Sequence, residues 1–196
     1  NPRDYLNTNI VGFFNILEYS RSISAEHLTY ASTSSAYGAN TLLPFSEKNH
    51  ADHPIQFYAA TKRSNELMAH SYSCIYGLPT SGLRFFTVYG PWGRPDMALY
   101  KFTKNIIAGE EIEIFNHGKH IRDFTYVEDI VDGITKVNNN PSKGNAEWDS
   151  LNPDPSSSFA PFEVYNLGNS EPVELMTYVQ TIEDYLGKKA NIKFLP

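Results

Sequence analysis

The chain has 196 residues, of which 41% are hydrophobic and 19% are charged, and its formal net charge is −6. This size suits one globular domain, or part of a larger one, with a sizeable core. The acidic balance and the lack of a basic stripe argue against nucleic acid as a partner, and no run of about 18 apolar residues predicts a membrane span. The single cysteine, Cys74, excludes an intrachain disulfide, so we expect a reducing, cytoplasmic location.

Helix-like and strand-like segments alternate along the chain. Apolar positions with a helical period predict helices over 4–20, 55–76, 97–108, 127–137 and 174–187. Short apolar runs predict strands over 27–32, 80–89, 111–115, 162–168 and 191–195. Segments 40–55 and 138–161, which contain Pro and many polar residues, are expected to be loops. The alternation is typical of an α/β fold with a mainly parallel sheet.

Three segments follow predicted strands at the point where a ligand would bind. In parallel sheets, ligands lie outside the carboxyl ends of the strands. The three segments are STSSAYG (32–38), TVYGPWGR (87–94) and YNLGNS (165–170).

A tyrosine precedes a lysine by four residues at three places: Tyr58/Lys62, Tyr100/Lys104 and Tyr185/Lys189. Such a pair shares one face of a helix. With 13 tyrosines in the chain, chance matches are expected, so the spacing counts only in the right context. Only the first pair has a predicted strand end upstream, at Ser32-Thr33, whose hydroxyl could reach the tyrosine, and the third spans Gly187, a predicted helix stop.

A tyrosine, a lysine and a hydroxyl together suggest proton abstraction coupled to hydride transfer. A free tyrosine has a pKa of about 10, and a neighbouring ammonium favours the phenolate and lowers that value. The tyrosine can then accept a proton from a substrate hydroxyl, while a Ser or Thr hydroxyl holds the substrate oxygen. Because no side chain accepts a hydride, this chemistry implies a nicotinamide cofactor.

A dinucleotide-binding fold should begin with a strand, a G-x-G-x-x-G-type turn and a helix, and the chain contains no such turn. Either the nicotinamide interpretation is wrong, or the first half of the fold is absent from these residues. Other chemistries have less support. There is no G-x-S-x-G elbow, and the pairs His50/His53 and His117/His120 fall in predicted loops without a companion cysteine, so we expect no metal site.

Five motifs, in this order, resemble the extended short-chain dehydrogenase/reductase superfamily and, within it, the UDP-glucuronate 4-epimerases. They are ASTSSAYG, YAATK, LRFFTVYGPWGRPDMAL, RDFTYVEDI and VYNLGNSEPVELM, and the similarity runs through nearly all of residues 1–196. In that family a glycine-rich first βα unit and about two further units precede this region, and a C-terminal stretch follows it. We therefore expect the chain to be the middle and later part of a longer enzyme that is inactive as the isolated fragment.

The resemblance implies catalytic and cofactor-binding roles at matching positions. Thr33, Tyr58 and Lys62 match the Ser/Thr–Tyr–Lys triad, and Lys62 would also hold the nicotinamide ribose of NAD. Thr33 is the match because it stands four residues before the tyrosine of the YG pair. The remaining cofactor contacts would come from Asn9, Phe86 and Val88.

The resemblance also implies the substrate contacts. Thr87 and Arg94 match positions that hold the sugar carboxylate, and Arg122 matches an arginine that binds the diphosphate. Arg suits both groups because its planar fork can bind two oxygens at once. Together with Lys104, these arginines would supply positive charge to the cleft of an acidic chain.

The implied fold is α/β, a partial Rossmann-like parallel sheet with helices and a smaller substrate-binding region. Segments 1–86, 121–138 and 162–168 would belong to the NAD-binding domain, and segments 87–120, 139–161 and 169–196 to the nucleotide-sugar region. The implied reaction interconverts UDP-glucuronate and UDP-galacturonate by transient oxidation at C4. The alternatives are another nucleotide-sugar epimerase, a dehydratase, a UDP-glucuronate decarboxylase or a non-catalytic nucleotide-sugar-binding fragment. The family usually forms homodimers through two helices, which would be 4–20 and 55–76 here.

Overall fold

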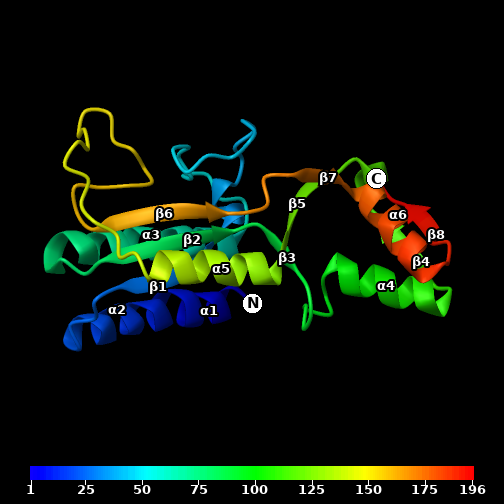
Figure 1. Cartoon of the computed structure of the whole chain (residues 1–196), viewed down its shortest axis with the longest axis horizontal. Coiled ribbons are helices and arrows are strands. Elements are labelled where there is room, and N and C mark those ends of the chain that lie inside the picture. The colour runs from blue at the N-terminus through cyan, green and yellow to red at the C-terminus, as the bar shows by residue number, and fades with distance from the viewer. The chain divides into compact units, whose positions relative to one another are not determined.

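The computed structural model describes all residues, 1–196, and divides into two compact units (Figure 1). The first unit comprises Asn1–Phe86 and Val131–Leu167, and the second comprises Thr87–Ile130 and Gly168–Pro196. None of the helices combines the length and the apolar character that a membrane crossing demands.

The first unit is built on a parallel sheet of three strands, in the order β1 (Leu28–Thr33), β2 (Thr80–Phe85) and β6 (Phe162–Leu167). Thr33 pairs with Phe85, which pairs with Leu167, so the three strands end at the same level. The expected α/β fold with a parallel sheet is confirmed. Two of the three segments predicted to lie at a ligand site, 32–38 and 165–170, are at the carboxyl ends of β1 and β6.

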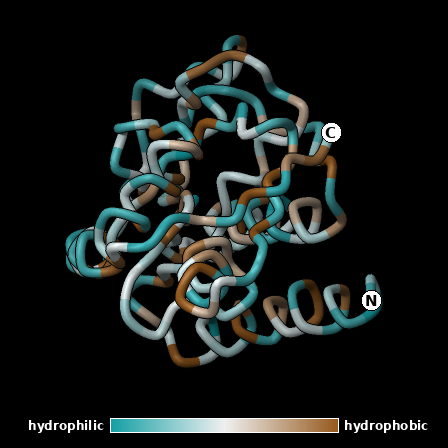
Figure 2. Tube along the Cα trace, turned by 90° about the vertical axis from the view of Figure 1, so that its right-hand side faces the viewer, coloured by the Kyte–Doolittle hydropathy of each residue, from teal (hydrophilic) through white to brown (hydrophobic).

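The helices of the first unit pack on this sheet. The N-terminal helix consists of α1 (Pro2–Tyr5), a π-helical segment η1 (Leu6–Val11) and α2 (Gly12–Ser22). The central helix α3 (Phe57–Tyr76) ends at Gly77, whose φ of 66° allows the left-handed C-cap. Polar and apolar residues alternate in bands along the helix that begins at the N-terminus (Figure 2). Its apolar face joins a core made of Leu17, Tyr30, Ala69, Leu78, Phe162 and Val164.

Two loops of the first unit are fixed by specific contacts. The 3₁₀ turn η2 (Ser34–Tyr37) leads into the predicted loop 40–55, which Asn166 holds by donating from Nδ2 to the Phe45 carbonyl (3.1 Å). The predicted loop 138–161 is anchored where Ser142 donates to the Thr80 carbonyl (2.9 Å). Both loops therefore pack on the sheet although neither contains a strand or a long helix.

The second unit contains two small sheets. One has the order β3 (Thr87–Tyr89), β5 (Ile121–Tyr126) and β7 (Pro172–Glu174), and the other pairs β4 (Glu111–Ile114) with β8 (Asn191–Phe194). The helices are α4 (Ala98–Ala108) and α6 (Leu175–Leu186), with a short turn η3 (Asn116–Gly118). The core is aliphatic and consists of Ile106, Ile112, Ile114, Val179 and Ile182.

The structure corrects two predictions about the elements. The predicted strand 80–89 is two strands, because β2 ends at Phe85 and β3 starts at Thr87 in a different sheet. Segment 121–126 was not predicted to be a strand, yet it forms β5, which pairs with β3 and β7. Its mixture of charged and aromatic residues gives no clean alternation, which explains why the pattern does not reveal it.

The division into units also differs from the predicted domain boundaries. Residues 121–130 belong to the second unit, because β5 pairs with β3 and not with the main sheet. Residues 139–161 belong to the first unit, because the loop is bound to β2 and to α3 through Ser142 and Ser158. The helix α5 (Val127–Asn138) has its first four residues in the second unit and the rest in the first.

Candidate active site

The amino end of α3 carries the tyrosine and the lysine of the predicted triad. The helix starts after Gln56, whose backbone is extended, so Tyr58 and Lys62 occupy its first two turns. The ring of Tyr58 packs against that of Tyr5, with 5.7 Å between the centroids. Burial lowers the pKa of Lys62, and the nearby charge of Glu66 opposes part of this shift. The lysine therefore sits in a partly desolvated position next to a carboxylate.

Asn9 is bound to the same turn of α3. Its side-chain Nδ2 donates to Thr61 Oγ1 (2.9 Å), and Thr61 Oγ1 donates to the Tyr58 carbonyl (2.7 Å). In return, Asn65 Nδ2 donates to the Asn9 carbonyl (2.6 Å). The structure thus brings Asn9 next to the turn that carries Tyr58 and Lys62, although Asn9 is 52 residues away from its partner Thr61 in the sequence.

Thr33 lies at the carboxyl end of β1, where the chain turns into η2. Its side-chain oxygen accepts a hydrogen bond from the Ser35 N–H (3.2 Å) and so caps this turn. A threonine hydroxyl that accepts one bond still has a proton to donate. The capped geometry therefore leaves Thr33 able to hold a substrate oxygen.

The second unit contains a pocket of about 770 Å³ between β3, the turn that follows it, and α4. Three residues predicted to bind the ligand line it: Val88, Arg94 and Lys104. Aromatic and apolar side chains make up most of the wall, namely Tyr89, Trp92, Met97, Leu99, Tyr100 and Ile107. A mainly apolar pocket with a few charged groups is typical of a small-molecule site.

Arg94 is engaged by Asp96 in this structure. Its Nε donates to Asp96 Oδ1 (3.0 Å) and its Nη2 donates to Asp96 Oδ2. The two bonds form a bidentate contact between the guanidinium and the carboxylate. These hydrogen bonds lower the pKa of Asp96. The pair is exposed, so a ligand carboxylate could compete for the same fork at little cost.

The remaining predicted site residues lie apart from these two groups. Phe86 is the last residue of the first segment of the first unit, and it packs on a buried cluster that includes Ala36 and Tyr37. Thr87 begins β3, opposite Phe124, and does not line the pocket. Arg122 is an exposed residue of β5, and its Nη1 donates to the Ile121 carbonyl (3.2 Å).

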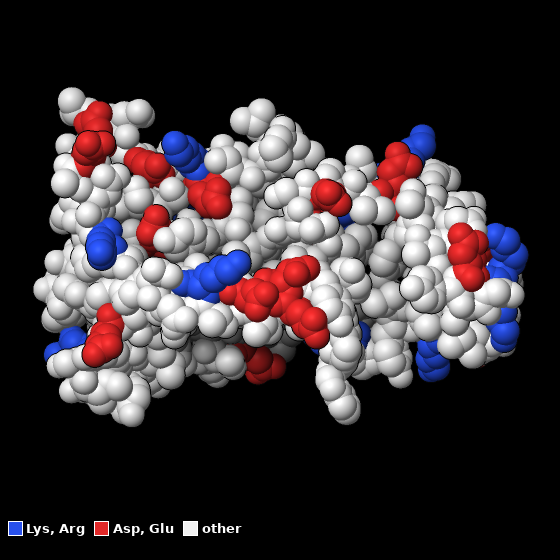
Figure 3. Space-filling model, in the orientation of Figure 1, with Lys and Arg blue, Asp and Glu red and all other residues white.

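The structure also reveals polar residues that the sequence analysis missed. Glu66 and Arg84 form a fully buried ion pair beneath the amino half of α3. A signal was present, because Arg84 is the only charged residue in β2 and Glu66 stands one helical turn after Lys62. On the face drawn in Figure 3, basic side chains form no continuous band across the molecule, although several gather at the right-hand edge.

The first unit fits one end of a nicotinamide dinucleotide. Tyr58 and Lys62 lie at the amino end of α3, which is linked to the carboxyl end of β1, where Thr33 stands, through the hydrogen bond from Ser32 to Glu66. The half-buried Lys62 could bind ribose hydroxyls, and Asn9 could bind a polar group. No G-x-G-x-x-G turn, the motif that binds the pyrophosphate in dinucleotide-binding folds, is present among residues 1–196.

Comparison with known proteins agrees with this arrangement. The chain is 58% identical to Protein CapI of Staphylococcus aureus over 195 residues, covering 100% of this chain and 58% of that protein. It is 46% identical to UDP-glucuronate 4-epimerase 5 of Arabidopsis thaliana, covering 100% of this chain and 45% of that protein. Its fold is similar to the crystal structure of UDP-glucuronic acid 4-epimerase from Bacillus cereus in complex with NAD, with a TM-score of 0.79 at 30% identity over 99% of this chain and 57% of that one.

The chain thus spans between about half and three fifths of the length of these relatives. Over residues 1–168 its sequence matches the family described as the NAD dependent epimerase/dehydratase family. Since this match covers most of the chain, the protein belongs to the NAD dependent epimerase/dehydratase family.

Proposed function

We propose that the whole protein to which this chain belongs is an NAD-dependent UDP-sugar 4-epimerase that interconverts UDP-glucuronate and UDP-galacturonate. The observation that carries the proposal is the hydrogen bonding of Asn9 to the turn of α3 that carries Tyr58 and Lys62. Thr33 stands at the carboxyl end of β1 in the same unit. The names of the relatives, which include UDP-glucuronate 4-epimerases, support the choice of sugar.

Each residue of the first unit has a distinct task in this proposal. Tyr58 accepts and returns the proton of the sugar C4 hydroxyl, and Thr33 orients that hydroxyl by a hydrogen bond. Lys62 favours the phenolate and binds the nicotinamide ribose. Asn9 and Phe86 provide the further cofactor contacts of this unit, and Val88 of the second unit provides another. Bound NAD supplies the acceptor and donor of the C4 hydride.

The basic residues of the second unit recognise the charged parts of the substrate. Arg94, with Thr87, binds the carboxylate of the uronic acid, and Arg122 and Lys104 bind the diphosphate. The support for Arg94 is its position in the pocket wall and the bidentate contact it already makes with the carboxylate of Asp96. A guanidinium that binds one carboxylate in this way has the geometry to bind another.

The division of roles predicts different kinetic effects for two arginine variants of the whole protein. Arg94→Ala should lower kcat/KM for UDP-glucuronate by roughly 10- to 100-fold and leave that for UDP-glucose nearly unchanged, because only the uronate has the carboxylate. Arg122→Ala should lower both values by the same factor, because both substrates have the diphosphate. Product analysis by chromatography, with both sugars tested on both variants, measures these effects.

Arg94→Ala should also shift the product toward the decarboxylated sugar, since oxidation at C4 makes the uronate a β-keto acid, which loses CO₂ readily when its carboxylate is not held. An unchanged product ratio together with an unchanged rate contradicts the role of Arg94. Turnover of UDP-glucose alone would indicate a UDP-hexose epimerase, release of CO₂ by the unmodified protein a decarboxylase, and ligand binding without turnover a non-catalytic binding protein.

The proposal also covers the roles of the two units and the oligomeric state of the whole protein. The first unit would carry most of the NAD site and the second the nucleotide-sugar contacts, in a cytoplasmic homodimer formed by the N-terminal helix and α3. Both helices expose large apolar side chains, including Phe14, Tyr19, Leu67 and Ile75. Sedimentation of the whole protein should give the mass of a dimer, and a monomer at micromolar concentration would contradict this assembly.

A further inference from the structure

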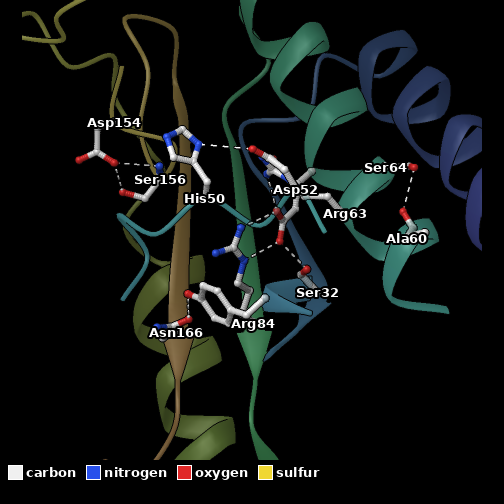
Figure 4. A network of polar contacts seen from close by, with 12 residues as sticks. Ser32, His50, Asp52, Ala60, Arg63, Ser64, Arg84, Asp154, Ser156 and Asn166 are labelled. Carbon is white, nitrogen blue, oxygen red and sulfur yellow. Dashed lines mark hydrogen bonds and ion pairs between the residues drawn. The ribbon is translucent and has the colours of Figure 1, made fainter. Parts of the chain in front are cut away.

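A single carboxylate joins the elements that carry the triad. Glu66 is completely buried, and Ser32 Oγ donates to its Oε1 (2.6 Å). Arg84 binds the same carboxylate with two nitrogens, Nε to Oε1 (2.9 Å) and Nη2 to Oε2 (2.8 Å), and Arg63 Nη1 adds a fourth bond to Oε2 (2.8 Å). Figure 4 shows Ser32, Arg63 and Arg84 directed toward this shared point. Four bonds to one buried group fix its position closely.

Glu66 and its partner Ser32 lie on the same two elements as the triad residues. Ser32 is the neighbour of Thr33 at the end of β1. Glu66 follows Lys62 by one helical turn and Tyr58 by two, which is about 6 and 12 Å along the helix axis. The carboxylate therefore connects the strand that bears the hydroxyl to the helix that bears the phenol and the ammonium.

The direction of α3 makes this connection matter. At the far end of the helix, Ser73 Oγ lies 2.9 Å from Oγ1 of Thr80, the first residue of β2, whereas Glu66 binds Arg84, the fifth. The helix thus runs antiparallel to β2, and its amino end extends past the carboxyl ends of the strands. The segment of α3 that precedes Glu66 and carries Lys62 and Tyr58 extends beyond the edge of the sheet. The bonds of Glu66 to the sheet therefore determine where these two side chains lie.

The buried network is charged and not merely polar. Burial opposes the ionisation of Glu66, but the hydrogen bonds and the charge of Arg84 outweigh it and hold the pKa of Glu66 below its ordinary value. Arg84 is itself fully buried and also lies over the ring of Tyr37, 4.7 Å from its centroid. Charge-assisted hydrogen bonds of this kind are short and directional, which favours one fixed geometry.

We propose that Glu66 is a positioning residue of the reaction, which acts through Ser32 to hold the end of β1, and hence Thr33, at the correct distance from Tyr58 and Lys62. The inference rests on the proposed function, because it assigns a role in that same site. Glu66 does not touch the substrate. Its contribution is to keep the overhanging turn of α3 and the strand end in register, where a displacement of about 1 Å can cost roughly 100-fold in rate.

Ser32→Ala in the whole protein tests the proposal, because it removes one bond of the network and leaves the ion pair intact. The matched control is Ser73→Ala, which removes a buried hydroxyl that links the same helix to the same sheet at the opposite end. Both variants should lower Tm by about 2–4 °C. Only Ser32→Ala should lower kcat, by roughly 10- to 100-fold, with KM for the UDP-sugar and Kd for NAD within about twofold of the parent. Binding of NAD is followed by fluorescence titration.

Glu66→Gln is the second variant, and it should lower kcat further than Ser32→Ala if it folds. Equal kcat values for Ser32→Ala and Ser73→Ala would overturn the positioning role, as would a loss confined to KM or to NAD affinity. Tyr58→Phe and the unmodified protein run alongside. If the unmodified protein turns over a UDP-sugar, Tyr58→Phe is inactive and Ser32→Ala is fully active, only this inference fails. If the unmodified protein turns over no UDP-sugar, the proposed function fails and this inference fails with it.

Discussion

Of the three tyrosine–lysine pairs with a spacing of four, Tyr58 and Lys62 lie on the helix that is hydrogen-bonded to the end of β1, and Tyr100 and Lys104 line the pocket of the second unit. Lys62 is half-buried beside Glu66, and Asn9 binds the turn between the two residues. Tyr185, by contrast, is 90% exposed near the end of α6, before the helix stops at Gly187. The same spacing therefore has a site around it at one position and solvent at another.

Tyr58→Phe should reduce kcat of the whole protein by roughly 10²- to 10⁴-fold, because it removes the proton acceptor and keeps the ring that packs on Tyr5. The coupled assay for UDP-sugar epimerisation measures this loss. The matched control, Tyr185→Phe, removes an equivalent hydroxyl from a pair with the same spacing and should leave kcat unchanged. Similar activity in the two variants would rule out Tyr58 as the proton acceptor.

At the residue scale, the sequence predicted the side chains that would act but not those that hold them. Tyr58, Lys62 and Asn9 were expected at the cofactor site, and the structure brings them together. Glu66 and Arg84 were missed, because a charged residue in a segment read as strand or helix is assigned to the surface by default. Their pairing depends on β2 lying under α3, which is tertiary information.

At the scale of the elements, loop 40–55 is held by the turn that leads into it. Gly38 has a φ of 56°, and a Cβ at this position would collide with the carbonyl of His53 and with Pro54. The loop can therefore close against η2 only because residue 38 has no side chain. Gly77, at the end of α3, has a φ of 66° and open space where its Cβ would be.

Gly38→Ala should destabilise the protein by about 2–4 kcal/mol, the sum of backbone strain and a steric clash with backbone atoms. Gly77→Ala has the strain without the clash and should cost about 1 kcal/mol. Urea unfolding of the two variants measures both values. If Gly77→Ala is the more destabilising of the two, the close packing of loop 40–55 does not contribute to stability.

A histidine makes the contact between α3 and the loop 138–161 sensitive to pH. His70 Nε2 lies 2.9 Å from Ser158 Oγ, and its ring packs edge-on against Phe162. Burial lowers the pKa of His70 from its ordinary value of 6.5. Between the lowered pKa and 6.5 the unfolded chain binds more protons than the folded one, so stability falls as the pH falls through this range.

His70→Gln should reduce this dependence, because glutamine does not titrate. We expect the free energy of unfolding to drop less between pH 7.5 and pH 5.5 in the variant than in the parent protein. Denaturant unfolding at the two pH values measures the difference. Equal drops in the two proteins would show that His70 does not contribute to the pH dependence.

The elements themselves were largely predictable, and the exceptions have physical causes. The long helices over 55–76, 97–108 and 174–187 are confirmed, since many apolar positions define their period. The run over 80–89 was read as one strand, because a change of sheet at Phe86 leaves no mark on its apolar pattern. Strand pairing decides such cases, and a single sequence does not reveal it.

At the scale of the whole molecule, the chain contains the residues proposed for catalysis but not the glycine-rich turn that usually binds the pyrophosphate of a dinucleotide. Residues 1–196 by themselves should bind NAD at least about tenfold more weakly than the whole protein and should not turn over a UDP-sugar, because no glycine-rich turn is available to bind the pyrophosphate. Fluorescence titration of both proteins with NAD measures this difference. Equal affinity would mean that the pyrophosphate is bound by residues within the chain.

The fold class and the family were predictable because they rest on several motifs in a fixed order. The parallel sheet and the match to the NAD dependent epimerase/dehydratase family confirm both. The boundaries of the two units were not predictable in the same way. They depend on whether β5 pairs with β3 or with the main sheet, and on where the loop 138–161 makes its hydrogen bonds.

The π-helical segment η1 corrects the phase of the N-terminal helix. In a regular α-helix each residue turns the chain by about 100°, so Tyr5 and Leu17, twelve residues apart, would differ by about 120° around the axis. A π turn absorbs about one extra residue, which reduces the difference to about 20°. Tyr5 can therefore pack on Tyr58 while Leu17 stays in the core. Apart from those at Asn9, substitutions between Leu6 and Val11 should be tolerated more readily than the deletion of one residue, which would turn Tyr5 away from the site.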